Sequence, residues 1–220
     1  WQVREALAFF AGDVNPGDVI LVNDPYSSGT HLNDVAMIVP VFAERHRIAF
    51  AVVRAHWTDV GGMTPGSVSG RATEIFQEGL RLRPTKLYVQ GQLNEELWHI
   101  IADNCRIPSL NRGDIGALVA ALNTGERRLM RLVEKFGLEQ VRSSMTGTLE
   151  QTEHRTRAIL SDILAGDYRF VDYLEDDYVS DVPVRVSVTL RSSGNGEVTL
   201  DFTGSDPQVR AALNLPTGGQ

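Results

Sequence analysis

Two runs of strand-forming residues joined by a short polar segment constrain the fold of this chain most strongly. Residues 35–42 and 48–55 are rich in valine, isoleucine and alanine, and only residues 43–47 lie between them. Two such runs at so short a separation are typical of an antiparallel β-hairpin. We therefore expect a hairpin with a polar five-residue loop at its tip.

The ends of this hairpin carry residues that bind metals. Pairing Phe42 with Ile48 across the loop places Asp34 directly opposite His56, on the face that also carries Ile38, Phe50 and Val52. His31 precedes Asp34 by three residues and can curl toward it. Two imidazoles and one carboxylate at a strand end form a facial triad that suits zinc, manganese or Fe(II).

The spacing leaves a plainer interpretation open, in which Asp34 caps a turn and His56 is a hydrogen-bonded strand-end residue. A register slip of one residue would also move His56 to the other face.

The rest of the chain predicts an α+β fold in three regions. Residues 1–92 form a β-rich hairpin region with a further strand at 19–23, after an amphipathic helix at 1–10. Residues 93–165 are helical, and residues 166–220 return to β character. We expect the last region to contain an antiparallel hairpin of strands 182–190 and 197–202 around the turn at 192–196.

Helix boundaries in the central region follow from capping residues. Asn94, followed by two glutamates, predicts the start of the first helix. A second helix is expected from about Asp114 to Gly137, since glycine is favoured just after a helix. A third is expected from about Leu138 to Ala165.

Charge and cysteine content restrict the class of protein. The 220 residues are 42% hydrophobic and 22% charged, with a formal net charge of −7 and a pI of about 5.2. An acidic chain disfavours general binding to nucleic acid or to an anionic membrane, and no apolar run is long enough for a transmembrane helix. The single cysteine, Cys105, cannot form an internal disulfide, which favours a reducing, cytoplasmic location.

The two ends of the sequence predict a piece of a longer polypeptide. The chain begins with Trp1 inside a helical pattern and stops in turn-like residues, without a signal peptide.

Further candidate site residues lie close to the triad in the sequence. Asp59 follows His56 by three residues and is expected to orient a ligand imidazole, to act as a general base, or to cap the bend at Gly61 and Gly62. The two glycines open a loop whose N–H groups could bind a phosphate or a carboxylate of the substrate, or that could be a flexible turn. Tyr26 is a candidate for substrate contact.

Several long motifs resemble the hydantoinase B/oxoprolinase family, and together they span nearly the whole chain. They are residues 17–26, 29–35, 54–62, 64–67, 73–81 and 201–205. That family includes the B-type subunits of ATP-dependent hydantoinases, half of 5-oxoprolinase, and large subunits of acetone and acetophenone carboxylases. Its subunits are about twice as long, so the resemblance also implies a fragment of a larger domain.

The resemblance implies a metal site at the residues already singled out. In the acetone carboxylase branch the pattern is His-x-x-Asp followed by a histidine 22 residues after the aspartate, which His31, Asp34 and His56 match. It further implies that ATP is bound by an A-type partner, which phosphorylates the carbonyl of a small-molecule substrate in a hetero-oligomer with this chain.

The motif around residues 30–34 favours the branch that hydrolyses cyclic amide C–N bonds. A manganese-dependent ketone carboxylase is the alternative, and a non-catalytic assembly fragment is an alternative of another class.

Overall fold

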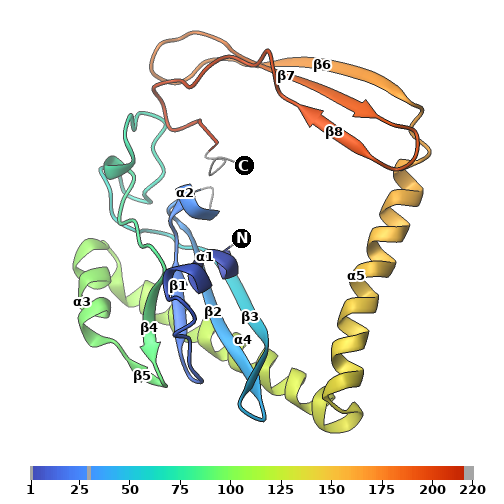
Figure 1. Ribbon diagram of the computed structural model, residues 1–220. Coiled ribbons are helices and arrows are strands. Elements are labelled where there is room, and N and C mark those ends of the chain that lie inside the picture. Colours follow the sequence, from blue (N-terminus) through green and yellow to red (C-terminus); the bar gives the residue numbers. More distant parts are fainter. Residues whose placement is uncertain (1, 29–30, 216–220) are drawn as a thin grey trace.

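A computed structural model describes residues 2–28 and 31–215 of the chain. The described residues form a five-stranded sheet with helices on both faces, two long helices, and a separate three-stranded sheet (Figure 1). The expected α+β class is confirmed. Trp1 of the expected first helix, and Gly29 and Thr30 of the second motif, lie outside the described residues.

The first sheet is antiparallel at each of its described strand pairs. Its spatial order is β3-β2-β1-β4-β5, and its strands are β1 (Val19–Val22), β2 (Asp34–Ala43), β3 (His46–His56), β4 (Thr85–Val89) and β5 (Gln92–Leu93). Only the first three were expected from the sequence. Since β1 runs antiparallel to β2 and β4, and β3 runs antiparallel to β2, one end of the sheet contains the last residues of β1 and β3 together with the first residues of β2 and β4. We call this the α2 end of the sheet, since the short helix α2 (Pro25–Ser28) follows β1 there (Figure 1).

The hairpin of β2 and β3 has the predicted register over most of its length. Asp34 lies opposite His56, and the same register continues to the pair of Val41 with Ala49. Side chains alternate along a strand, so Asp34 and His56 share a face with Ile38, Phe50 and Val52, as expected.

The tip of the hairpin differs from the expectation. Phe42 pairs with Arg47 rather than with Ile48, because the register shifts there and Ile48 becomes the extra residue of a β-bulge. The expected five-residue loop is a two-residue turn of Glu44 and Arg45, with φ angles of 49° and 70°. Positive φ at both positions is the geometry of a type I′ turn, which reverses the chain so tightly that both strands extend into the polar segment.

Both faces of the first sheet are covered by helices. One face packs on α3 (Glu95–Asn104) and α4 (Pro108–Phe136) through a core that includes Leu21, Val35, Met37, Trp57, Leu87 and Trp98. The other face packs on α1 (Gln2–Phe9) through a smaller core of Ala6, Val14, Ile20, Val22, Ala36 and Ile38. Asp34 and His56 therefore lie on the α1 face of the sheet.

The helices begin and end close to the expected residues. The Asn94 side chain accepts a hydrogen bond from Leu97 N at 3.1 Å, so the first cap is confirmed. Helix α4 begins at Pro108, six residues before the expected Asp114, since proline is well suited to a first helical turn. Helix α5 (Leu138–Leu160) begins as expected and ends five residues early. Each helix among the described residues is too short or too polar to cross a membrane.

The second sheet has one strand more than expected. It consists of β6 (Gly166–Leu174), β7 (Val184–Ser192) and β8 (Val198–Asp201) in that order, so the expected hairpin is the second half of a three-stranded sheet. Helices α4 and α5 carry this sheet away from the first one (Figure 1). The segment between β6 and β7 returns toward the first sheet, where the Tyr178 ring packs against Gly70.

Candidate metal centre

Two histidines and one aspartate come together at the α2 end of the first sheet. Asp34 is the first residue of β2 and His56 is the last of β3, so the hairpin register makes them cross-strand neighbours. His31 lies in the turn before β2, where its carbonyl oxygen accepts a hydrogen bond from Asp34 N at 3.1 Å. One hairpin and the turn before it thus assemble all three residues expected to bind a metal.

The Asp34 carboxylate lies between the two imidazole rings. Its Oδ1 is 3.0 Å from His56 Nδ1, and its Oδ2 is 3.5 Å from His31 Nδ1. The ring centroids are 5.8 Å apart and the rings are nearly perpendicular, at 82°. The His31 and His56 side chains are 61% and 52% exposed, against 17% for Asp34. The carboxylate is therefore held, while both rings have room to turn.

The donor set and its spacing fit a divalent transition-metal ion. One ligand atom from each of the three residues lies within 4.8 Å of the other two. Nitrogen and carboxylate ligands bind zinc at about 2.0–2.2 Å, so ligands of one ion lie roughly 3–3.5 Å apart. Small rotations of the exposed imidazoles are enough to bring ligand atoms that lie within 4.8 Å of one another to this shorter separation. Three ligands from one strand end also leave coordination positions for water and substrate.

Arg54 supports the carboxylate from the same strand as His56. It lies two residues before His56, hence on the same face of β3, and its Nη2 donates to Asp34 Oδ2 at 3.0 Å. Hydrogen bonds of this kind fix the orientation of a ligand side chain and tune its affinity for a metal. Arg54 is therefore a positioning residue of the candidate site.

Asn33 extends the hairpin by one pair beyond the candidate ligands. Its Nδ2 donates to Trp57 O at 2.8 Å, and Trp57 N donates to Asn33 O at 2.8 Å. Both residues are buried, with exposed fractions of 2% and 1%. These bonds secure the strand ends that carry Asp34 and His56.

Asn23 joins two segments that are distant in the sequence. Its Nδ2 donates to Leu32 O at 2.7 Å and to Leu80 O at 2.9 Å, while its Oδ1 accepts from Leu82 N at 2.6 Å. Residues 80–82 are thereby fixed beside the turn that carries His31.

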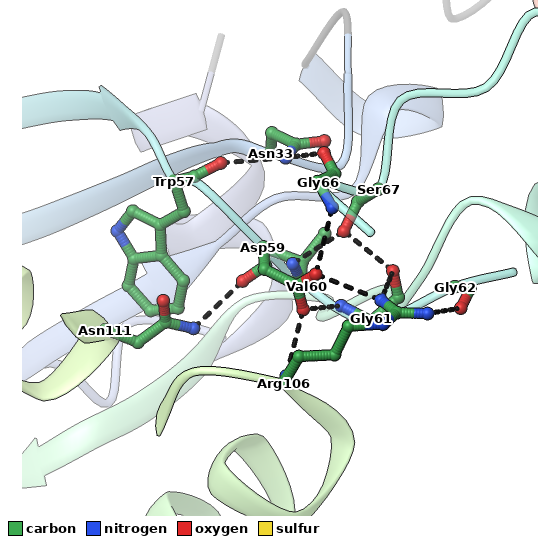
Figure 2. A network of polar contacts seen from close by, with 10 residues as sticks. All are labelled: Asn33, Trp57, Asp59, Val60, Gly61, Gly62, Gly66, Ser67, Arg106 and Asn111. Atoms are coloured by element: carbon green, nitrogen blue, oxygen red, sulfur yellow. Dashed lines mark hydrogen bonds and ion pairs between the residues drawn. The ribbon is translucent and has the colours of Figure 1, made fainter. Parts of the chain in front are cut away.

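Asp59 makes the contacts of a loop cap. Its side chain is buried, with an exposed fraction of 2%. Oδ1 accepts hydrogen bonds from Gly61 N at 2.9 Å and from Arg106 N at 3.1 Å (Figure 2). Oδ2 accepts from Arg106 Nη1 at 3.0 Å and from Gly66 N at 3.2 Å. Burial alone would raise the pKa of Asp59, but these hydrogen bonds outweigh burial and hold the pKa below its ordinary value. Of the three roles expected for Asp59, these contacts favour the cap, and a role in catalysis stays a prediction.

Gly61 and Gly62 are required by close packing of the backbone. Their φ angles are 91° and 85°, and a Cβ on either would lie 2.5 or 2.6 Å from a backbone carbonyl oxygen. The Gly61 N–H is already bound to Asp59, and the two glycine carbonyls accept from Arg106 at 3.2 and 2.6 Å. The role of these glycines in substrate binding stays a prediction.

Sequence reasoning missed three side chains that complete this network. Arg106 closes the loop over Asp59, Asn111 Nδ2 donates to Asp59 O at 3.0 Å, and Ser67 Oγ donates to Gly61 O at 2.7 Å (Figure 2). Arg106 and Asn111 lie about fifty residues from Asp59 in the sequence, and no periodicity links them. Asn111 also lies before Asp114, where the second helix was expected to begin, so no expected helix face pointed to it.

Two further residues lie near the α2 end of the sheet. Tyr26 is 54% exposed on α2, and the Arg81 guanidinium lies over its ring at 5.5 Å from the centroid. Glu78 is half-buried just after a 3-10 turn, Ile75–Gln77, near enough to His31 for their charges to interact. Burial raises the pKa of Glu78, and His31 opposes that rise only in part.

Known proteins are similar to this chain in sequence and in fold. The chain belongs to the hydantoinase B/oxoprolinase family, which matches it over residues 1–219. The family resemblance read from the sequence motifs is thereby confirmed.

Individual relatives agree with this assignment. The beta subunit of the caprolactamase of Pseudomonas jessenii is 34% identical over 212 residues, which are 96% of this chain and 36% of that protein. The crystal structure of the ATP-dependent caprolactamase from P. jessenii has a TM-score of 0.90 at 32% identity, over 96% of this chain and 36% of that chain. A protein of Pseudomonas sp. strain NS671, provisionally named as the B-type subunit of a D-/L-hydantoinase, is 35% identical over 223 residues, 99% of this chain and 38% of that protein.

A more distant structure shares the fold. Nucleotide-free acetone carboxylase has a TM-score of 0.86 at 20% identity, over 96% of this chain and 29% of that chain. The present chain spans little more than a third of the length of the curated relatives described above.

Proposed function

We propose that this chain supplies the metal-binding part of an ATP-dependent hydrolase that opens cyclic amides. The observation that carries the proposal is the cluster of ligand atoms from His31, Asp34 and His56, all within 4.8 Å of one another. Membership in the hydantoinase B/oxoprolinase family and similarity to part of a caprolactamase support the substrate class, since a caprolactam is a cyclic amide.

His31, Asp34 and His56 would hold the metal, with zinc and manganese as the first candidates and Fe(II) as a third. When bound, such an ion polarises a carbonyl oxygen and lowers the pKa of a bound water toward about 7. Asp34 keeps its orientation through Arg54, and the hairpin holds His56 opposite it.

Glu78 is suited to move the proton that ring opening requires. In hydrolysis the oxygen of water bonds to the carbonyl carbon, the C–N bond breaks, and the nitrogen leaves with a proton. Glu78 is half-buried, and its carboxyl group lies near enough to His31 for their charges to interact, which places a group able to carry a proton beside the candidate ligands. The Asp59 network would position the loop beside these groups.

A second polypeptide completes this proposal. Two of the relatives are named as one subunit of a larger enzyme, which supports a hetero-oligomer. We assign ATP binding to an A-type partner, which is the division of labour that the family resemblance implies. The single cysteine and acidic composition support a cytoplasmic location for the complex.

Metal content tests the proposal directly. The chain is purified, incubated with Zn²⁺, Mn²⁺ or Fe²⁺, desalted and measured by plasma mass spectrometry, beside His31→Ala/His56→Ala. The matched control is His46→Ala, since His46 lies at the opposite end of β3. We expect about one ion per chain in the wild type and the control, and none in the double variant.

Two other results would overturn parts of the proposal. No metal in the wild type with any ion would favour the assembly role instead. Bound metal together with bicarbonate-dependent carboxylation of a ketone, in the presence of the A-type partner, would favour the carboxylase branch over ring opening.

A further inference from the structure

The middle of β3, residues 49–53, is a strand edge that no other described strand covers. β3 is the outermost strand of the first sheet and pairs there with β2 alone (Figure 1). Residues 49–53 carry neither a charge nor a proline. Proteins normally protect such an edge with charged residues, prolines or a covering element, because it is a template for a further strand. This edge is therefore suited to pair with another polypeptide segment.

The hydrogen bonds of the hairpin determine which backbone groups of β3 point outward. Trp57 N donates to Asn33 O at 2.8 Å, and the same register continues along the hairpin to Ala49. In an antiparallel pair every second residue bonds to the neighbouring strand, so the odd-numbered residues of β3 face β2 in this register. The N–H and C=O groups of Phe50 and Val52 therefore point away from β2, where an added strand can bond to them.

An apolar groove lies along this edge, between β3 and α4. Its volume is about 360 Å³, and its lining consists of apolar residues and one glycine. Small residues keep it open, since a Cβ on Gly125 of α4 would lie 4.0 Å from Ala51 Cβ on β3. Val52 also lines the groove and is 48% exposed. An apolar side chain of an added strand would fill this groove and cover Val52.

The charges of β3 indicate what kind of strand would pair with it. β3 carries Arg47 and Arg54 but no acidic residue, although the whole chain has a net charge of −7. The exposed Arg47 guanidinium lies over the ring of Phe50, at 5.1 Å from the centroid, and Phe50 lines the groove. A second copy of this chain, paired through its own β3, would add further arginines and no carboxylate. An acidic residue on the added strand would complement Arg47 instead.

We propose that the edge of β3 binds an extended segment of a partner protein, with apolar side chains at alternate positions and an acidic residue opposite Arg47. The segment would extend the first sheet by one strand. Backbone hydrogen bonds to Phe50 and Val52 would supply affinity, and apolar side chains in the groove along α4 would supply specificity. The docking surface contains none of the candidate metal ligands, so the inference does not rest on the proposed function.

Labelled synthetic peptides test the inference by fluorescence anisotropy with the full chain. The first peptide alternates valine and threonine between two terminal glutamates. The second has lysines in place of the glutamates. The third keeps the side chains of the first but is N-methylated along its backbone, so it lacks the N–H groups that pair with a strand edge.

Three variants change the edge, the groove and the charge separately. Val52→Pro removes an outward N–H without removing a bond to β2, Gly125→Leu fills the groove, and Arg47→Glu reverses the charge. The matched controls are Gly116→Leu, where nothing lies within 4 Å of an added Cβ on α4, and Arg83→Glu, before β4 on the other side of the sheet. Far-UV circular dichroism and metal content are measured for every variant.

We expect the wild type and both controls to bind the glutamate peptide and not its N-methylated form. Val52→Pro and Gly125→Leu should each weaken binding by about 10-fold, through a lost hydrogen bond and lost burial of a side chain. Arg47→Glu should reverse the preference between the glutamate and lysine peptides, by roughly 2- to 5-fold, the range for an exposed ion pair. In NMR hydrogen exchange, the peptide should slow the amides of Phe50 and Val52.

The inference is wrong if the folded wild type binds neither charged peptide, or binds the N-methylated peptide equally well. Unchanged binding by both Val52→Pro and Gly125→Leu would also overturn it. A dimer in sedimentation velocity that Val52→Pro dissociates would show that a second copy covers this edge instead. Failure of the proposed function is a separate result, which would appear as a chain that lacks metal but still binds the glutamate peptide.

Discussion

Asn33 and Trp57 exchange two hydrogen bonds of 2.8 Å at the point where β2 begins and β3 has just ended. One of them is a backbone bond that continues the hairpin ladder, and the other comes from the asparagine side chain. This pair of hydrogen bonds lies one residue from both Asp34 and His56. The candidate ligands thus occupy a firmly closed strand end rather than a frayed one.

Replacing Asn33 by alanine tests how much this closure matters. The variant leaves the buried Trp57 carbonyl without its side-chain donor, so we expect a loss of roughly 1–3 kcal/mol in the free energy of unfolding. Urea denaturation measures it. Asn123→Ala is the control, since Asn123 is exposed on α4 and its removal should change stability by less than about 0.5 kcal/mol. Equal stabilities of the two variants would show that the closure is dispensable.

Arg54→Met should weaken metal binding without removing a ligand. Arg54 donates to Asp34 Oδ2 at 3.0 Å, and loss of such a supporting bond typically lowers metal affinity by about 10- to 100-fold. Competition with a chelator of known affinity gives the dissociation constant. Arg45→Met, at the far turn, should leave it unchanged. A tighter site in Arg54→Met would mean that the guanidinium competes with the ion for Asp34.

Asp59 makes the stability of the chain depend on acidity. Its folded-state pKa lies below the unfolded value of about 3.9, so the unfolded chain binds the proton more readily. The carboxylate therefore stabilises the fold above about pH 4, and this contribution is lost as the pH falls through the folded-state pKa. Asp59→Asn should lose roughly 2–3 kcal/mol at pH 7 and show a smaller further loss below pH 4. Unfolding curves from pH 2 to 7 test both effects, with exposed Asp103→Asn as the control.

Two glycine substitutions should act in opposite directions. Gly62 has a φ of +85°, and a Cβ there would lie 2.6 Å from Gln77 O, so Gly62→Ala should cost about 2 kcal/mol or more. Gly113 is inside α4 with nothing within 4 Å of an added Cβ, so Gly113→Ala should gain up to about 1 kcal/mol. Thermal or urea unfolding measures the stability of both variants. Destabilisation by Gly113→Ala would contradict the prediction that the two substitutions act in opposite directions.

Cys105 should be unreactive in the folded chain. Burial, with the nearby Asp59 charge, raises the pKa of its thiol to about 11. At pH 8 the thiolate is then rare, and alkylation by iodoacetamide should be on the order of 100-fold slower than in the urea-unfolded chain. Mass spectrometry of timed samples measures both rates. Fast alkylation of the folded chain would indicate a reactive cysteine.

The sequence was most informative where a single local pattern determines the geometry. Alternation and a short connection were enough to place Asp34 opposite His56, and Asn94 was enough to start α3. The bulge at Ile48 was not predictable, because it depends on how a type I′ turn and the strand twist fit together.

Contacts between distant segments were not predictable in the same way. Strand β4 forms because it can pair with the buried β1, and β6 because it can pair with β7; neither has a strong pattern of its own. Arg106 reaches Asp59 only because α3 and α4 pack on one face of the sheet. A pocket that Arg81 and Arg83 line likewise needs α1 and α2 to be placed over the sheet before it exists.

The bulge at Ile48 lies between the hairpin tip and the candidate metal ligands, and it accommodates the one residue by which β3 is longer than β2 in this part of the hairpin. From Val41 and Ala49 onward, the pairing that leads to Asp34 and His56 does not depend on how the tip is built. The tip at Glu44 and Arg45 is therefore a permissive position, at which an affinity tag or a fluorophore could be grafted while the opposite end of the hairpin keeps its function.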